Sequence, residues 1–140
     1  MPHPAFEVLE HTADVGIKAY GDTLPQLFSN AARGLVSLAL ESPPTASAQS
    51  LPLSVRGDDY EDLLVNWLSE ILFRIDAEGW AFADFTIQRL EAHLVEGIAL
   101  GEIITDLGQR PRSLVKAVTY HQVSVSQTPQ GWQAIVYFDI

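Results

Sequence analysis

Two amphipathic segments constrain the fold of this chain more than any other feature. In the first, residues 23–38, Thr23 is followed three residues later by Gln26, which is a capping pattern typical of a helix start. In the second, residues 58–78, acidic residues precede a long apolar stripe, and Gly79 follows where a helix would end. Each stripe needs an apolar surface to cover it. The two segments therefore predict two helices that pack against a sheet.

The stretches around these helices alternate apolar and polar residues, which is typical of strands. The expected strands span about 15–21, 51–57, 81–90, 91–96, 100–105, 114–126 and 132–139, with the turn "TPQG" joining the last two. The stretch "ESPPTASAQS", residues 41–50, predicts a surface connection. This order predicts an α+β fold over residues 1–140: a single-domain two-layer sandwich with two helices on one face of a largely antiparallel, mixed sheet.

Composition excludes several function classes. The 140 residues are 47% hydrophobic, enough for one buried core, and contain no cysteine, which excludes disulfides, cysteine-bound metals and thiol catalysis. A net charge of −10 disfavours direct nucleic-acid binding and suits a hard cation or a basic partner. The chain shows neither a membrane-span pattern nor a signal-peptide pattern, so a cytoplasmic location without membrane contact is expected.

Four carboxylates stand at the start of the second helix and have two interpretations. They could bind a metal, but acidic residues at a helix start are also favoured by its free N–H groups and its dipole. The sequence favours the capping interpretation. The residues are Asp58, Asp59, Glu61 and Asp62.

Two further polar segments interrupt apolar sequence. The segment "EHTADVG" precedes the first expected strand and is either a turn or part of a metal site. Its polar residues are Glu10, His11, Thr12 and Asp14. The segment "GEIITDLGQRPR", residues 101–112, is better interpreted as exposed strand and loop than as a ligand or phosphate site. Its charged residues are Glu102, Asp106, Arg110 and Arg112.

The segment "VKAVTYH", residues 115–121, does not form a recognisable catalytic arrangement. On a regular strand Lys116 and His121 point to opposite faces, so they cannot act as a side-by-side pair. The sequence contains neither a Ser, His and Asp arrangement with known spacing nor a glycine-rich phosphate loop.

The sequence closes with "VYFDI", which places the Asp139 side chain beside the main-chain carboxylate of Ile140. If the hairpin turns at "TPQG", its register sets Asp139 opposite Tyr120 and Ile140 opposite Thr119. Crowded carboxylates are unfavourable unless a cation or a donor compensates, and Ca²⁺ or Mg²⁺ prefers such oxygen ligands. A hard-cation site and a solvated chain terminus are both compatible with this pattern.

Several motifs together resemble the archease family. They are "HTADVGIKAYGDTLPQLF", the helix "DDYEDLLVNWLSEILF", "GE" at 101–102, "VKAVTYH" and the closing "FDI", in the family's order along nearly the whole chain. The resemblance implies a protein cofactor that activates the GTP-dependent RNA-splicing ligase. Such a cofactor promotes transfer of GMP to the ligase and its multiple turnover in tRNA splicing or RNA repair. It is not an enzyme itself.

The resemblance also implies site residues. The matching metal ligands are Asp14, Asp139 and the main-chain carboxylate of Ile140, and the metal is expected to be Ca²⁺, with Mg²⁺ or Mn²⁺ as alternatives. Lys116 matches a lysine that would contact the ligase or its nucleotide. The loop "LGQRPRSL" departs from the family pattern, so no role is carried over to it. The alternative functions are a metal-dependent hydrolase and a chaperone-like binding module.

Overall fold

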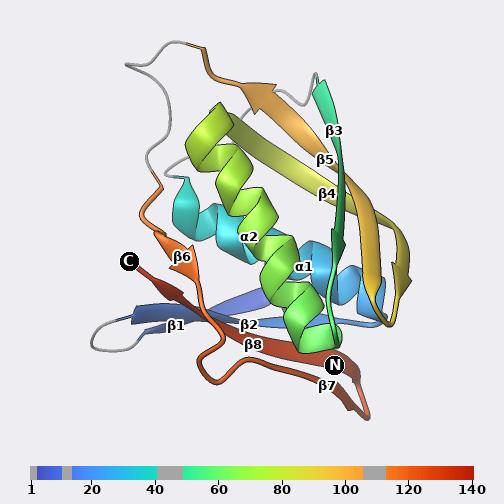
Figure 1. Cartoon of the computed structure of the whole chain (residues 1–140). Helices are drawn as coiled ribbons and strands as arrows, with labels where there is room; N and C mark the ends of the chain where they lie inside the picture. Colours follow the sequence, from blue (N-terminus) through green and yellow to red (C-terminus); the bar gives the residue numbers. More distant parts are fainter. Residues whose placement is uncertain (1–2, 11–13, 41–48, 106–112) are drawn as a thin grey trace.

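The computed structural model describes residues 3–10, 14–40, 49–105 and 113–140 (Figure 1). The expected surface connection at 41–50 lies almost entirely outside the described residues. The elements in these ranges are β1 (Phe6–Glu10), β2 (Asp14–Gly21), α1 (Leu24–Ala39), β3 (Gln49–Arg56), α2 (Tyr60–Glu78), β4 (Trp80–Glu91), β5 (Leu94–Ile103), β6 (Ala117–Val118), β7 (Ser124–Thr128) and β8 (Gly131–Asp139).

The strands form two antiparallel sheets. The first has the order β1-β2-β8-β6, with β7 also paired to β8, and the second has the order β3-β5-β4. Helix α1 contacts β2 of the first sheet and β4 of the second, and α2 likewise contacts strands of both, so the helices fill the angle between the sheets (Figure 1). The α+β class is confirmed. The difference from expectation is that the strands divide between two sheets rather than one.

The helix ends follow from local sequence. Thr23 caps α1 by accepting a hydrogen bond from the Gln26 N–H at 3.2 Å. Asp59 caps α2 by accepting from the Asp62 N–H at 2.8 Å, and Gly79 ends α2 with a φ of 80°, a conformation that suits glycine. The capping interpretation of the acidic cluster is confirmed. In the part of the chain that the structure describes, no helix combines the length and apolar character needed to cross a membrane.

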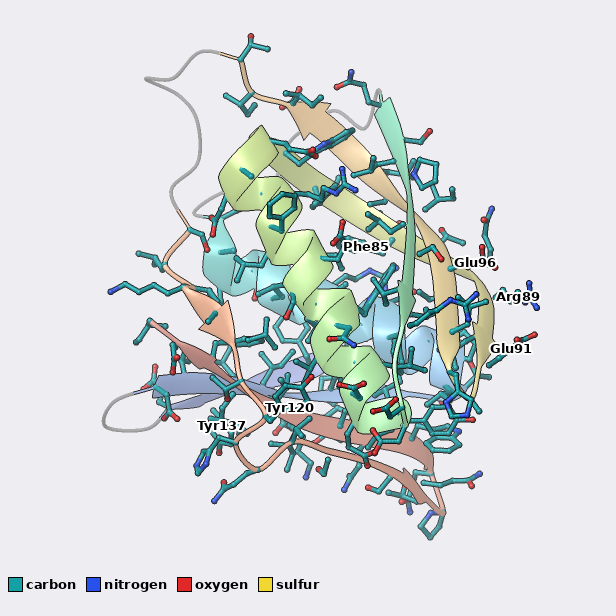
Figure 2. The ribbon with its side chains drawn as sticks, in the orientation of Figure 1. Phe85, Arg89, Glu91, Glu96, Tyr120 and Tyr137 are labelled. Atoms are coloured by element: carbon teal, nitrogen blue, oxygen red, sulfur yellow. The ribbon has the colours of Figure 1, made fainter. Side chains whose placement is uncertain are left out.

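Strands β4 and β5 correct the expected boundaries. The segments expected at 91–96 and 100–105 are one continuous strand, and the ion pairs of Arg89 with Glu91 (2.9 Å) and Glu96 (3.5 Å) lie at its hairpin end (Figure 2). Gly97 lies inside this strand, where close packing requires a glycine. A Cβ there would lie 2.8 Å from the Thr86 carbonyl oxygen.

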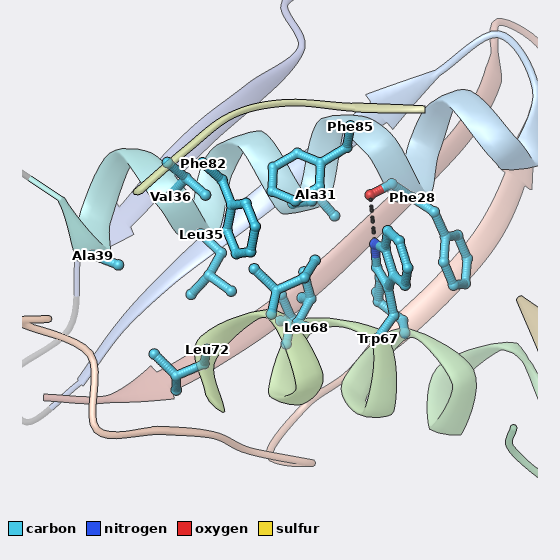
Figure 3. Packing of buried hydrophobic residues seen from close by; sticks show 14 of the residues in the cluster. Phe28, Ala31, Leu35, Val36, Ala39, Trp67, Leu68, Leu72, Phe82 and Phe85 are labelled. Carbon is cyan, nitrogen blue, oxygen red and sulfur yellow. Dashed lines mark hydrogen bonds between the residues drawn. The ribbon is translucent and has the colours of Figure 1, made fainter. Parts of the chain in front are cut away.

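The core lies between the helices and the two sheets. Trp67 of α2 is fully buried, and its indole N–H donates to the Phe28 carbonyl of α1 at 3.2 Å (Figure 3). Phe82 and Phe85 of β4 pack beside this pair (Figure 3). Because one polar contact and several aromatic rings meet here, the core fixes how the two helices lie against each other.

Candidate metal and partner site

Asp14 and Asp139 face each other at one end of the first sheet. Asp14 begins β2, Asp139 ends β8, and they are direct partners in the antiparallel ladder. Directly opposite residues carry their side chains on the same face of a sheet, so the two carboxylates are neighbours. Asp139 is exposed and Asp14 is partly buried. The structure thus brings together two residues that lie 125 positions apart in the sequence (139 − 14).

The strands hold this pair in register through the core. Val15 pairs with Phe138 and Ile17 with Val136, and Ile17, Val136 and Phe138 are almost fully buried. A shift by one residue would turn these side chains to the opposite face, so the apolar pattern specifies the register. It thereby places Asp14 and Asp139 on the other face of the sheet.

Ile140 follows at the same sheet end. Ile140 is 53% exposed and lines an open pocket of about 610 Å³. The pocket is lined by apolar residues and by two acidic ones. Its lining residues are Glu10, Asp14, Val15, Leu38, Leu114, Val115 and Ile140.

The expected register near the chain end is wrong. Residues of β7 follow it, since Thr128 pairs with Gly131 and Ser124 with Ile135. Asp139, however, pairs with Ala117 instead of Tyr120, because residues 119–123 leave the ladder in a turn. The strand expected over 114–126 is therefore split into β6 and β7. Between Val118 and Ser124 the chain contains three residues more than the matching part of β8, from Ile135 to Phe138.

This break brings Lys116 to the aspartate pair. Its backbone N–H donates to the Asp139 carbonyl at 2.7 Å, and its side chain is exposed. Lys116 therefore lies next to the row formed by Ala117, Asp139 and Asp14 on three neighbouring strands. His121, also exposed, lies in the turn, where its ring is 5.9 Å from the ring of Tyr137.

The donor set at this sheet end suits a hard cation. It would consist of oxygens alone, from the two aspartates and the main-chain carboxylate of Ile140, which is the ligand type that Ca²⁺, Mg²⁺ and Mn²⁺ prefer. Among the described residues, no group of three or more His, Cys, Asp or Glu side chains could hold a metal. The proposed set contains two such side chains, so further ligands would have to come from water or a partner.

The acidic cluster of α2 makes a contact that the sequence did not reveal. The Tyr120 hydroxyl donates to Asp62 Oδ1 at 2.6 Å. This hydrogen bond and one from the Asp58 N–H lower the pKa of Asp62, and the carboxylate in turn raises the pKa of Tyr120. No local pattern indicates such a pair, because 58 positions separate its members.

The remaining candidates are placed as follows. Glu10, from the segment interpreted as either a turn or part of a metal site, lies at the end of β1 and lines the pocket. Glu102 lies on β5 opposite Ala81, as expected of a strand residue. The others lie outside the described residues: His11, Thr12, Asp106, Arg110 and Arg112.

Comparison with known proteins gives consistent matches over nearly the whole chain. The model of the Archease protein family matches residues 6–140. "Protein archease" of Pyrococcus furiosus is 35% identical over 139 residues, covering 96% of this chain and 98% of the relative. "Protein archease" of Saccharolobus solfataricus is 38% identical over 136 residues, with 96% and 98% coverage. The solution structure of Methanobacterium thermoautotrophicum protein 1598 matches with a TM-score of 0.82 at 31% identity, covering 97% of this chain and 99% of that one.

Proposed function

Because the chain belongs to the archease family, we propose that it is a protein cofactor of the GTP-dependent RNA-splicing ligase. In this role it promotes the attachment of GMP to the ligase and sustains the ligase's turnover, without catalysing a reaction itself. Family membership supports a cofactor role toward RNA-processing enzymes. We propose further that the partner is this ligase and that the two proteins meet in the cytoplasm.

The observation that carries the proposal is the meeting of Asp14, Asp139 and Lys116 at one sheet end. Asp14 and Asp139 pair across β2 and β8, and the Lys116 N–H binds the Asp139 carbonyl. Together with the main-chain carboxylate of Ile140, the aspartates would hold a divalent cation such as Ca²⁺, Mg²⁺ or Mn²⁺. Bound there, the cation would supply positive charge that offsets the carboxylates.

The chemistry of the partner fits such a surface. Transfer of GMP is a phosphoryl transfer, which depends on positioning and on stabilisation of charge. The Lys116 side chain is exposed, and in this proposal it contacts the ligase or its nucleotide. The net charge of −10 suits a basic surface on the ligase and opposes independent binding to RNA.

The test is a guanylylation assay with purified ligase and labelled GTP. Substoichiometric amounts of this protein should raise the rate of GMP attachment, and the protein alone should join no RNA. An unchanged rate across all ratios would contradict the proposal.

Two control assays address the other functions. Turnover of phosphoesters by this protein without ligase would favour a metal-dependent hydrolase. Suppressed aggregation of unrelated unfolded proteins would favour a chaperone-like module.

A further inference from the structure

The chain between β6 and β7 is a turn fastened to β8. Within residues 119–123 the Val123 N–H donates to the Tyr120 carbonyl at 3.2 Å, and Gln122 has a φ of 53°, unusual for a residue other than glycine. The N–H and hydroxyl of Thr119 both donate to the Tyr137 carbonyl, at 3.0 and 2.9 Å. These bonds hold one side of the turn to the first sheet.

The other side of the turn is tied to helix α2 by Tyr120. Its hydroxyl reaches Asp62 Oδ1 at 2.6 Å, although the residue is 57% exposed, and Figure 2 shows Tyr120 between the chain after β6 and the lower end of α2. Hydrogen bonds to an ionised acceptor are shorter and stronger than neutral ones. Beside it, the Val125 N–H donates to Glu61 Oε1 at 3.3 Å. The start of α2 therefore anchors this turn.

Hydrogen bonds at the start of α2 hold the Asp62 carboxylate in place. Its Oδ2 accepts from the Asp58 N–H at 2.8 Å, and its own N–H donates to Asp59 Oδ1 at 2.8 Å. The carboxylate that binds Tyr120 is thus part of the helix cap. An anchor of this kind restricts the turn without burying it.

We propose that Tyr120 is a positioning residue for the candidate site, because its hydrogen bond to Asp62 keeps the segment 116–120 against β8. Lys116 lies four residues before Tyr120 in the chain, and its N–H binds the Asp139 carbonyl. Loss of the hydrogen bond between Tyr120 and Asp62 would make this segment more mobile, and Lys116 would then be held less firmly beside Asp139. The effect on the ligase rests on the proposed function, whereas the effect on the segment does not.

The first measurement is amide hydrogen exchange by NMR in the variant Tyr120→Phe, which keeps the ring and removes the hydroxyl. Exchange at Lys116 and Thr119 should become roughly three- to ten-fold faster. The pKa of Asp62, followed in the same spectra, should rise toward its usual value. Tyr60→Phe is the matched control, since Tyr60 lies at the start of α2 and its ring packs against the Trp132 ring.

The second measurement is ligase activation as a function of protein concentration. Tyr120→Phe should raise the concentration for half-maximal activation several-fold and leave the maximal rate unchanged. Unchanged exchange, or faster exchange with unchanged activation, would overturn the positioning role. If the wild-type protein activates no ligase, the proposed function fails, and the exchange result still decides whether Tyr120 holds the segment.

Discussion

Asp14 and Asp139 are direct partners across β2 and β8, so two like charges face each other at an open sheet end. Opposite residues in such a pair have Cβ atoms about 5 Å apart, and like charges at this separation destabilise the sheet. This pairing destabilises the metal-free protein, and a bound divalent cation would remove the repulsion by neutralising the two carboxylates. This relationship leads to the first prediction.

Asp139→Asn should change stability in opposite directions with and without metal. In chelator, removal of one like charge should stabilise the fold by about 0.2–1 kcal/mol. At a Ca²⁺ concentration 100 times the wild-type Kd, the wild type should gain about 2.7 kcal/mol, and the variant should lose most of this gain. Thermal unfolding in both buffers measures the two effects. Asp22→Asn, directly after the far end of β2, should respond to Ca²⁺ like the wild type.

Lys116→Ala should separate folding from activation. The side chain is exposed, so the free energy of unfolding should change by less than about 0.5 kcal/mol. Ligase guanylylation should nevertheless fall. Lys18→Ala is the matched control, because Lys18 is the other lysine of the chain and lies on the same sheet. Equal activation by both variants would mean that Lys116 is an ordinary surface residue.

Trp67→Phe should be strongly destabilising. Trp67 is fully buried, and the change removes both core volume and the hydrogen bond to the Phe28 carbonyl. A loss on the order of 2 kcal/mol is expected in urea-induced unfolding. Phe73→Leu, on the same helix but 54% exposed, should cost far less. Similar losses in the two variants would contradict this account of the core.

Asp84→Asn should change how the free energy of unfolding depends on pH in the acidic range. Partial burial raises the pKa of Asp84, but hydrogen bonds from Arg33 and from the Phe85 N–H outweigh it, so the pKa lies below its ordinary value. A carboxylate with a lowered folded pKa stabilises the fold above its unfolded pKa, and this contribution disappears as the pH falls through the folded value. The difference between wild type and variant should therefore be largest near neutral pH and vanish in acid. It should be small, because both side chains are substantially exposed.

The parts of the fold set by local chemistry could be predicted from the sequence. Thr23, Asp59 and Gly79 define the helix ends through neighbours three to five residues away, and the turn at 129–130 follows from its own residues. The division into two sheets could not be predicted. It depends on which distant strands pair, and alternation along one strand does not specify its partner.

The candidate site shows the same limit. The family resemblance implied Asp14, Asp139 and Ile140 as metal ligands and, separately, Lys116 as a contact to the ligase. The structure places Asp14, Asp139 and the Lys116 backbone at one sheet end. Sequence reasoning set Asp139 opposite Tyr120, because nothing in "VKAVTYH" signals that the strand breaks after Val118. The break is supported by the contact between Tyr120 and Asp62, which is a tertiary interaction.

The central claim, that the chain end is a metal ligand, is tested most directly by calorimetric titration of Ca²⁺ into a protein with a Gly-Ser extension after Ile140. The extension keeps every side chain and converts the terminal carboxylate into a neutral amide carbonyl. We predict that the Kd for Ca²⁺ rises roughly ten-fold or more, because the site loses a charge and a chelating oxygen. The same extension at the N-terminus should leave the Kd unchanged. Equal Ca²⁺ affinity in the C-terminally extended and wild-type proteins would contradict the claim.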